Sequence, residues 1–337
     1  MSEGQDKRRY WIGFDLGGTK MLAVVFDERL KPIARKRRKT RSSEGEPVSL
    51  ERLSETIVMA LEEIGAGPDA IAGIGCGVPG PLDLQKGLIL EAPNLGWKNV
   101  ALQDYLAKKF RCPAVICNDV DAGVFGEYTV GAGQGFRSVL GVFPGTGIGG
   151  GFVYEGRIFR GTRSSCMEVG YLQMATEGSA AGGGPVGTLE GLASRLAISA
   201  EAAKAVYRGQ APGLQEIAGT DISRIRSSAL AKSIEKGDKA IEQIVKRAAQ
   251  QVGRGIGSLI NILAPDVVIL GGGLVEAMPK LYLESVAEGI RRNVLPSLAD
   301  CGKLKVSELG DLAGATGAAA LVRQEAAEQP RKKLKEA

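Results

Sequence analysis

The 337-residue sequence contains no histidine. This absence excludes Ser-His-Asp and Cys-His nucleophile systems, histidine general bases, phosphohistidine intermediates and every metal site that needs an imidazole ligand. Any reaction that the protein catalyses must therefore use carboxylates, backbone amides, hydroxyl groups or lysine.

Cysteines and long apolar runs are also scarce. The most apolar long stretch, residues 258–278, is interrupted by Asn261, Pro265, Asp266 and three glycines, and the first nine residues lack the apolar core of a signal peptide. We therefore expect no secretory signal, no membrane span and a cytoplasmic location. The scattered cysteines form no Cys-X-X-Cys pair, which is typical of reduced thiols: Cys76, Cys112, Cys117, Cys166 and Cys301.

Neither sign of charge dominates, because 43 Lys and Arg face 38 Asp and Glu, for a net charge of +5. A prior of roughly 150 residues per domain predicts two domains. Glycine is abundant: 48 residues are about 14% of the chain, roughly twice the average usage. We expect many of these glycines in loops where the backbone approaches a ligand closely.

Hydrophobic periodicity predicts that one α/β unit occurs twice. The first copy has the order βββαβα: two strands joined by a glycine turn in residues 10–28, then a strand at 30–40, a helix at 50–65, a strand from 70, a helix at 102–110 and a further strand at 114–119. A second strand–turn–strand unit begins at residue 138, and helical segments then precede a strand ending in Leu270. We predict an N-terminal domain at 10–121, which a C-terminal helix at about 305–326 rejoins, a larger domain at 122–304, and flexible tails at 1–9 and 327–337.

Glycine-rich turns occupy equivalent places in the two copies, at 15–20 (DLGGTK) and 145–151 (GTGIGGG), and a third, 271–273, follows an apolar strand. Consecutive backbone N–H groups without side chains can bind phosphate. A dinucleotide-binding fold is disfavoured because residues 152–159 indicate a strand instead of the required helix. A P-loop and a protein-kinase fold are disfavoured because their motifs are missing.

These three turns resemble the phosphate-1, phosphate-2 and adenosine motifs of the actin-like ATPase superfamily. The strings VPGP at 78–81, PNLGW at 93–97, CNDVDA at 117–122, EVGY at 168–171 and TLEGLAS at 188–194 extend the resemblance, more closely, to the ROK family of sugar kinases and sugar-responsive repressors. It covers about residues 10–325. The resemblance implies a two-domain α/β fold, a duplicated ribonuclease H-like unit, with a cleft between the domains.

The resemblance also implies that the protein binds ATP and Mg²⁺. Asp15 would lie near the Mg²⁺ that accompanies ATP. The residues implied to bind the phosphates are Gly17, Gly18, Thr19, Lys20, Gly145, Thr146 and Gly147, and those implied at the adenosine are Gly271, Gly272 and Gly273.

On the sugar side, Asp119 matches the catalytic base of the family. The implied sugar-binding residues are Pro79, Gly80, Asn94, Asn118, Glu168, Tyr171 and Glu190. Carboxylates and amides suit sugar hydroxyls because each can form two hydrogen bonds. The implied reaction is glucokinase-like: the 6-hydroxyl of a hexose attacks the γ-phosphoryl group of ATP, and a carboxylate of ordinary basicity suffices as the base. Family members commonly form dimers or tetramers, so we expect a homo-oligomer.

The sequence departs from the family at its structural zinc site. Tyr171 replaces the histidine ligand, and Ala181, Gly183 and Thr188 replace the three cysteines. Because all four ligands are lost together, we predict a branch of the family without zinc, and a flexible loop at 177–187.

A basic run at 31–41 carries seven positive residues and no acid. It is typical of a nucleic-acid patch or of an edge strand whose charges prevent strand pairing. We favour the edge strand and no nucleic-acid partner because few aromatic residues accompany it.

Three functional alternatives remain: a catalytically silent sugar sensor or regulator, a kinase of fructose, mannose, allose or an N-acetylhexosamine, and a kinase that uses polyphosphate. ROK repressors carry a helix-turn-helix module ahead of the first phosphate motif, and with fourteen residues before Asp15 we do not expect one here.

Overall fold

In a computed structural model, which describes residues 9–162, 166–175 and 186–333, the chain forms two α/β units. The first comprises Met1–Gly135, Gly156–Cys166 and Asp311–Ala337, and the second comprises Phe136–Glu155 and Met167–Gly310. The first segment thus ends at Gly135, beyond the boundary expected near residue 121, because the helix that begins at Asp119 packs against the C-terminal helix of the same unit.

The first unit is built on a five-stranded sheet of order β3-β2-β1-β4-β8. Its strands are β1 (Tyr10–Leu16), β2 (Lys20–Phe26), β3 (Pro32–Lys39), β4 (Ile71–Val78) and β8 (Ala114–Asn118). Strands β1, β2 and β3 pair antiparallel, whereas β4 pairs parallel with β1 and with β8. The helices of the unit are α1 (Glu46–Glu62), α2 (Leu102–Phe110) and α3 (Asp119–Val130). Strands and helices follow one another in the predicted βββαβα order. A small sheet of β5 (Leu82–Asp83), β6 (Leu88–Ala92) and β7 (Trp97–Val100) is an insertion that the sequence did not predict.

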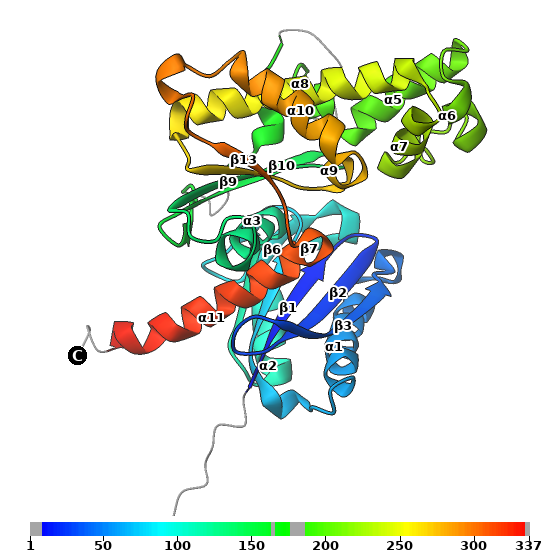
Figure 1. Cartoon of the computed structure of the whole chain (residues 1–337). Coiled ribbons are helices and arrows are strands. Elements are labelled where there is room, and N and C mark those ends of the chain that lie inside the picture. The colour runs from blue at the N-terminus through cyan, green and yellow to red at the C-terminus, as the bar shows by residue number, and fades with distance from the viewer. Residues whose placement is uncertain (1–8, 163–165, 176–185, 334–337) are drawn as a thin grey trace, which may run out of the picture. The chain divides into compact units, whose positions relative to one another are not determined.

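Helices cover both faces of this sheet. Side chains alternate between the faces of a strand, so Ile12 and Phe14 pack with the apolar residues of α1 and α2, whereas Gly13 and Gly75 face α11 (Ala313–Lys333) on the other side. A Cβ added at Gly75 would lie 1.8 Å from the carbonyl oxygen of Ala318, so α11 lies directly on the strand backbone (Figure 1). Helix α11 continues to Lys333, which corrects the prediction that a flexible tail begins at residue 327.

The second unit contains the strands β9 (Ser138–Pro144), β10 (Ile148–Tyr154), β12 (Val267–Leu270) and β13 (Lys303–Val306), in the order β10-β9-β12-β13. Helices α8 (Lys239–Leu263) and α10 (Pro279–Arg291) lie side by side, and the core joins strand residues such as Val142 and Leu270 to α8 (Figure 1). Its remaining helices are α4 (Leu189–Ala193), α5 (Arg195–Tyr207), α6 (Pro212–Ile217), α7 (Ser227–Glu235) and α9 (Gly273–Ala277); the short strand β11 (Arg157–Ile158) falls among residues of the first unit.

The basic run forms strand β3 at the edge of the first sheet, which confirms the predicted edge strand. Three side chains of β3 form ion pairs within the unit: Lys36 with Glu63 at 3.1 Å, Arg37 with Asp311 at 2.9 Å and Arg38 with Glu55 at 2.7 Å. In the part of the chain that the structure describes, no helix is both long and apolar enough to cross a membrane.

Candidate active site

The first glycine turn joins β1 to β2. The backbone N–H of Gly17 donates to the carbonyl oxygen of Lys20 at 3.0 Å, and the hydroxyl of Thr40 donates to the carbonyl oxygen of Gly17 at 2.6 Å. A Cβ at Gly18 would lie 2.8 Å from the Cβ of Asn94, in the 3₁₀ turn Pro93–Leu95. The turn is therefore held from two sides, whereas Thr19 and Lys20 are exposed. An exposed turn without side chains at two positions fits a phosphate group.

Asp15 and Asn118 lie at the carboxyl ends of β1 and β8, two strands that both pair with β4, and Asp119 follows β8 directly. In the sheet, Asp15 of β1 lies opposite Gly77 of β4, and Asn118 of β8 lies opposite the next residue of β4, Val78. Because the carboxyl ends of parallel strands meet at one edge of a sheet, the sequence motifs for metal and sugar come together there.

Asn118 is also the N-cap of α3. Its Oδ1 accepts the backbone N–H groups of Val120 at 2.9 Å and Asp121 at 3.1 Å. The cap uses the amide oxygen and leaves the amide NH₂ as the group of Asn118 that can donate to a ligand. Asp119, the first residue of α3, accepts the N–H of Val120 on Oδ1 at 3.0 Å.

The two aspartates lie in a poorly solvated environment. The pKa of Asp15 is raised from 3.8 to about 6, mainly by burial and next by the charge of Asp119; the smaller effects of Arg37, which lowers it, and Asp311, which raises it, are included in this value. Burial also raises the pKa of Asp119, although the N–H of Val120 opposes this shift. The carboxylate of Asp119 is thus more basic than the ordinary carboxylate expected from the sequence. A divalent cation would relieve this concentration of negative charge, and Mg²⁺ commonly uses one or two carboxylates together with water and substrate phosphates.

Pro79 and Gly80 follow β4 directly. Gly80 has φ +92°, and a Cβ there would lie 2.2 Å from the carbonyl oxygen of Glu91 in β6. Only glycine fits this close approach, so the backbone conformation ties the loop to the small inserted sheet. The first unit therefore groups all the site residues predicted for it: Asp15, Gly17, Gly18, Thr19, Lys20, Pro79, Gly80, Asn94, Asn118 and Asp119.

The second glycine turn, Gly145-Thr146-Gly147, joins β9 to β10. The N–H of Gly145 donates to the carbonyl oxygen of Gly147 at 2.8 Å. Glu190 of α4 accepts the N–H of Ile148 on Oε2 at 2.8 Å, and a Cβ at Gly147 would lie 2.3 Å from the same oxygen. One carboxylate oxygen of Glu190 therefore holds the end of the turn.

Glu168 and Tyr171 flank the 3₁₀ turn Val169–Tyr171, which packs against α4 and β10. Both are exposed, Tyr171 at 50%. A Cβ at Gly170 would lie 3.3 Å from the Cβ of Glu190, which brings this turn next to the predicted sugar ligand of α4. The phenol of Tyr171 can donate and accept hydrogen bonds at the edge of this group.

The positions of the lost zinc site are only partly described. Thr188 is the N-cap of α4 and accepts the N–H of Gly191 at 3.2 Å. Ala181, Gly183 and most of the predicted flexible loop at 177–187 lie outside the described residues. Within the described ranges, no three Cys, Asp or Glu residues are arranged to hold a metal ion.

The third turn, Gly271–Gly273, lies beside the end of β9. The N–H of Gly271 donates to the carbonyl oxygen of Val142 at 3.2 Å, and a Cβ at Gly272 would lie 2.7 Å from the carbonyl oxygen of Pro144. The predicted adenosine and phosphate turns are thus neighbours in the second unit. Its grouped site residues are Gly145, Thr146, Gly147, Glu168, Tyr171, Glu190, Gly271, Gly272 and Gly273.

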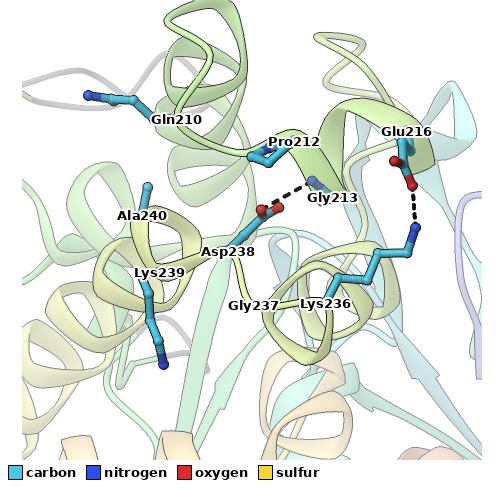
Figure 2. A pocket seen from close by; sticks show the side chains of 9 residues that line it. All are labelled: Gln210, Pro212, Gly213, Glu216, Lys236, Gly237, Asp238, Lys239 and Ala240. Carbon is cyan, nitrogen blue, oxygen red and sulfur yellow. Dashed lines mark hydrogen bonds and ion pairs between the residues drawn. The ribbon is translucent and has the colours of Figure 1, made fainter.

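A surface hollow of about 630 Å³ lies elsewhere in the second unit, between α6 and the start of α8 (Figure 2). The carboxylate of Asp238 in this hollow already accepts three hydrogen bonds from the protein: from the N–H groups of Gly213 at 3.1 Å and Leu214 at 2.7 Å, and from the hydroxyl of Ser233 at 2.6 Å. Lys236 and Glu216 pair with each other across the rim. None of the predicted site residues lines this hollow.

The sequence reasoning missed Thr40 and Arg195. Arg195 donates its backbone N–H to the carbonyl oxygen of Gly145 at 2.9 Å and its guanidinium to the hydroxyl of Thr146 at 2.7 Å. The available signal was the position of Arg195 immediately after the TLEGLAS string, five residues beyond Glu190.

Comparisons with known proteins identify the family of the chain. A model of the ROK family matches residues 11–325. The glucokinase of Thermotoga maritima is 30% identical over 314 residues, which are 93% of this chain and 97% of that protein. The xylose repressor of Caldicellulosiruptor bescii is 28% identical over 311 residues, which are 92% of this chain and 77% of the repressor.

Among solved structures, the ROK family glucokinase of Streptomyces griseus in complex with glucose and AMPPNP has a TM-score of 0.81 and 27% identity; the match covers 94% of this chain and 99% of that one. That enzyme has the two-domain actin-like ATPase fold, so the predicted fold is confirmed.

Proposed function

Because the chain belongs to the ROK family, we propose that it is an ATP-dependent hexose kinase that phosphorylates the 6-hydroxyl of its sugar. The observation that carries this proposal is a pair of poorly solvated carboxylates at one edge of a sheet, beside a bare glycine turn: Asp15 near the end of β1, and Asp119 directly after β8. The glucokinase relatives support the same reaction.

In this proposal Asp119 accepts the proton of the attacking hydroxyl. Its raised pKa makes it a better proton acceptor, and the N–H of Val120 fixes one of its oxygens, so that the other is available to the sugar. Phosphoryl transfer depends mainly on alignment and charge neutralisation, because its transition state is loose. A carboxylate held by the helix that it begins satisfies the alignment requirement.

The donor would bind along the three glycine turns. Gly17, Gly18, Thr19 and Lys20 contact phosphate in the first unit, and Gly145, Thr146 and Gly147 do so in the second, with the adenosine at Gly271–Gly273. Asp15 would hold Mg²⁺, directly or through water. When bound, Mg²⁺ neutralises charge on the transferring phosphoryl group.

The hexose would be read by the amide NH₂ of Asn118, by Asn94, and by the groups around the 3₁₀ turn of Tyr171. Glu168 and Glu190 present carboxylates, and Glu190 retains one oxygen that does not hold the glycine turn. Tyr171, which stands where relatives in the family have histidine, is longer and reaches further, so we expect it to bias the choice of hexose.

The experiment measures ADP release from Mg-ATP with glucose, mannose, fructose, allose, N-acetylglucosamine and N-acetylmannosamine. The test variant is Asp119→Asn, whose amide oxygen still accepts the N–H of Val120, and the matched control is Asp104→Asn, an exposed acid of α2 in the same unit. We expect sugar-dependent turnover that the first variant loses by a factor of about 10² or more, and that the control keeps.

Full turnover in Asp119→Asn would refute the assignment of the base. The xylose repressor relative favours one alternative, a regulator that binds sugar without turnover. No ADP release with any sugar, combined with a sugar-dependent rise in melting temperature, would support that regulator; turnover with polyphosphate in place of ATP would identify the other donor.

A further inference from the structure

Two arginines that no sequence motif assigns lie beside the glycine turns of the second unit. Arg195 is the first residue of α5, after the N-cap Ser194, whose side chain accepts the N–H of Ala197 at 3.2 Å. Its backbone and its guanidinium are bonded to consecutive residues of one turn, to Gly145 at 2.9 Å and to Thr146 at 2.7 Å. The cation is therefore fixed at the turn and is not a mobile surface side chain.

Arg226 is next in the chain to a residue that lies at the other glycine turn. It immediately precedes α7, and a Cβ at Gly273 would lie 3.5 Å from the hydroxyl of the next residue, Ser227. Its Nε reaches only a weak partner, the carbonyl oxygen of Ser223 at 3.5 Å. Burial, and then the charge of Arg226, lower the pKa of Arg195, so the two like charges influence each other.

Neither arginine is neutralised in the described part of the chain. Several lysines of the same unit are paired, by contrast: Lys204 with Glu201, Lys236 with Glu216, and Lys239 with Glu242. Arg195 and Arg226 form no ion pair with a described carboxylate. Guanidinium groups stay charged at every accessible pH, so the protein cannot relieve their repulsion by losing a proton.

An anion bound between the two arginines would remove this repulsion. The guanidinium fork matches phosphate oxygens, and the neighbouring turns contribute backbone N–H groups without side chains. Glu190 contacts the opposite end of the turn, where its Oε2 accepts the N–H of Ile148, and it forms no ion pair with either arginine in the described residues.

We propose that Arg195 and Arg226 bind the phosphate chain of the phosphoryl donor, Arg195 at the turn of Gly145–Gly147 and Arg226 toward Gly271–Gly273. This inference rests on the proposed kinase function and deepens it. Because the arginines read phosphate charge rather than the base, the site accepts an inorganic tripolyphosphate as well as ATP, and donor binding weakens as salt rises.

The test compares the dissociation constants of Mg-ATP, Mg-tripolyphosphate and adenosine by isothermal titration calorimetry. The variants are Arg195→Gln, Arg195→Lys and Arg226→Gln, and the matched control is Arg208→Gln, an exposed arginine at the opposite end of α5. We expect each glutamine variant to weaken both phosphate ligands about tenfold or more and to leave adenosine within about twofold. Arg195→Lys should lie between wild type and Arg195→Gln, since it keeps the charge but loses the fork.

Arg226→Gln protects the test against a folding artefact, because Arg226 has no hydrogen bond to the turn. Unchanged binding of both phosphate ligands in the two glutamine variants, equal weakening of adenosine, or a wild-type protein that binds neither phosphate ligand would overturn the proposal. The kinase function is tested independently, by measuring whether the wild-type protein releases ADP in the presence of the sugars named above. Phosphate binding that the variants lose, in a protein without turnover, would leave the arginine site standing while the kinase proposal fails.

Discussion

Replacing Asp15 by asparagine should stabilise the ligand-free first unit at neutral pH. Asparagine has nearly the same size and removes a charge that burial and the neighbouring Asp119 disfavour. A carboxyl group whose pKa is higher in the folded state than in the unfolded chain does not lower the free energy of unfolding at a pH where it is protonated in both states. The cost grows as the pH rises from the unfolded value toward the folded value, because the unfolded chain loses its proton first.

The magnitude follows from the two pKa values of Asp15. With 3.8 in the unfolded chain and about 6 in the folded protein, the cost of the charged carboxylate is about 3 kcal/mol at pH 8 and about 1.5 kcal/mol at pH 5. Asp15→Asn should therefore raise the free energy of unfolding by about 3 kcal/mol at pH 8, and the gain should fall by about half at pH 5. The same variant should lose sugar-dependent turnover, because the proposed Mg²⁺ ligand is gone.

Urea unfolding followed by tryptophan fluorescence provides the assay. Both tryptophans of the chain, Trp11 and Trp97, belong to the first unit, so the signal reports the unit that contains Asp15. Asp69→Asn, at an exposed acid of the same unit, is the control and should change the midpoint little. A destabilised Asp15→Asn protein at pH 8, or a gain that does not vary between pH 5 and pH 8, would refute this account of the site.

Two glycine substitutions test the close contacts. Gly75→Ala should destabilise the first unit by about 3 kcal/mol or more in the same fluorescence assay, because the new Cβ would lie 1.8 Å from a backbone oxygen of α11. The control, Gly67→Ala, should be tolerated because a Cβ there has no atom within 4 Å. Gly147→Ala should lower kcat/KM with little change in far-UV circular dichroism, because its Cβ would displace the Glu190 oxygen that holds Ile148. Unchanged kinetics would show that the turn tolerates a side chain.

The sequence predicts the repeated core of the fold because periodicity and turn residues are local signals. The strands around Asp15 and around Gly145 both appear at the expected places. The small sheet β5-β6-β7 escapes prediction because its strands span two to five residues, too few for an alternation to be recognised. The extension of α11 beyond residue 326 was not predicted, because the charged composition of the C-terminus suggested a flexible tail, whereas its Ala, Glu, Gln, Lys and Arg residues also favour helix.

The site is predictable where it depends on the ends of strands and on glycine turns. Parallel pairing of β1, β4 and β8 necessarily brings Asp15 and Asn118 to one edge. The pKa of Asp119 was not predictable, since it depends on how much of the carboxyl the folded chain removes from water. The role of Arg195 was equally hidden, because it depends on the tertiary contact between the start of α5 and the turn after β9.

That contact links the two halves of the proposed chemistry within one short segment. Glu190 and Arg195 stand five residues apart, on α4 and at the start of α5, and each bonds to a different end of the same turn: Glu190 to Ile148 and Arg195 to Gly145. The break between the helices at Ser194 allows a carboxylate and a guanidinium so close in sequence to reach opposite ends of the turn. A displacement of this segment would move a proposed sugar ligand and a proposed donor ligand together. Correct placement of the turn is therefore a shared condition for both proposed substrates. It depends on the side-chain carboxylate of Glu190 and on both the backbone N–H and the guanidinium of Arg195.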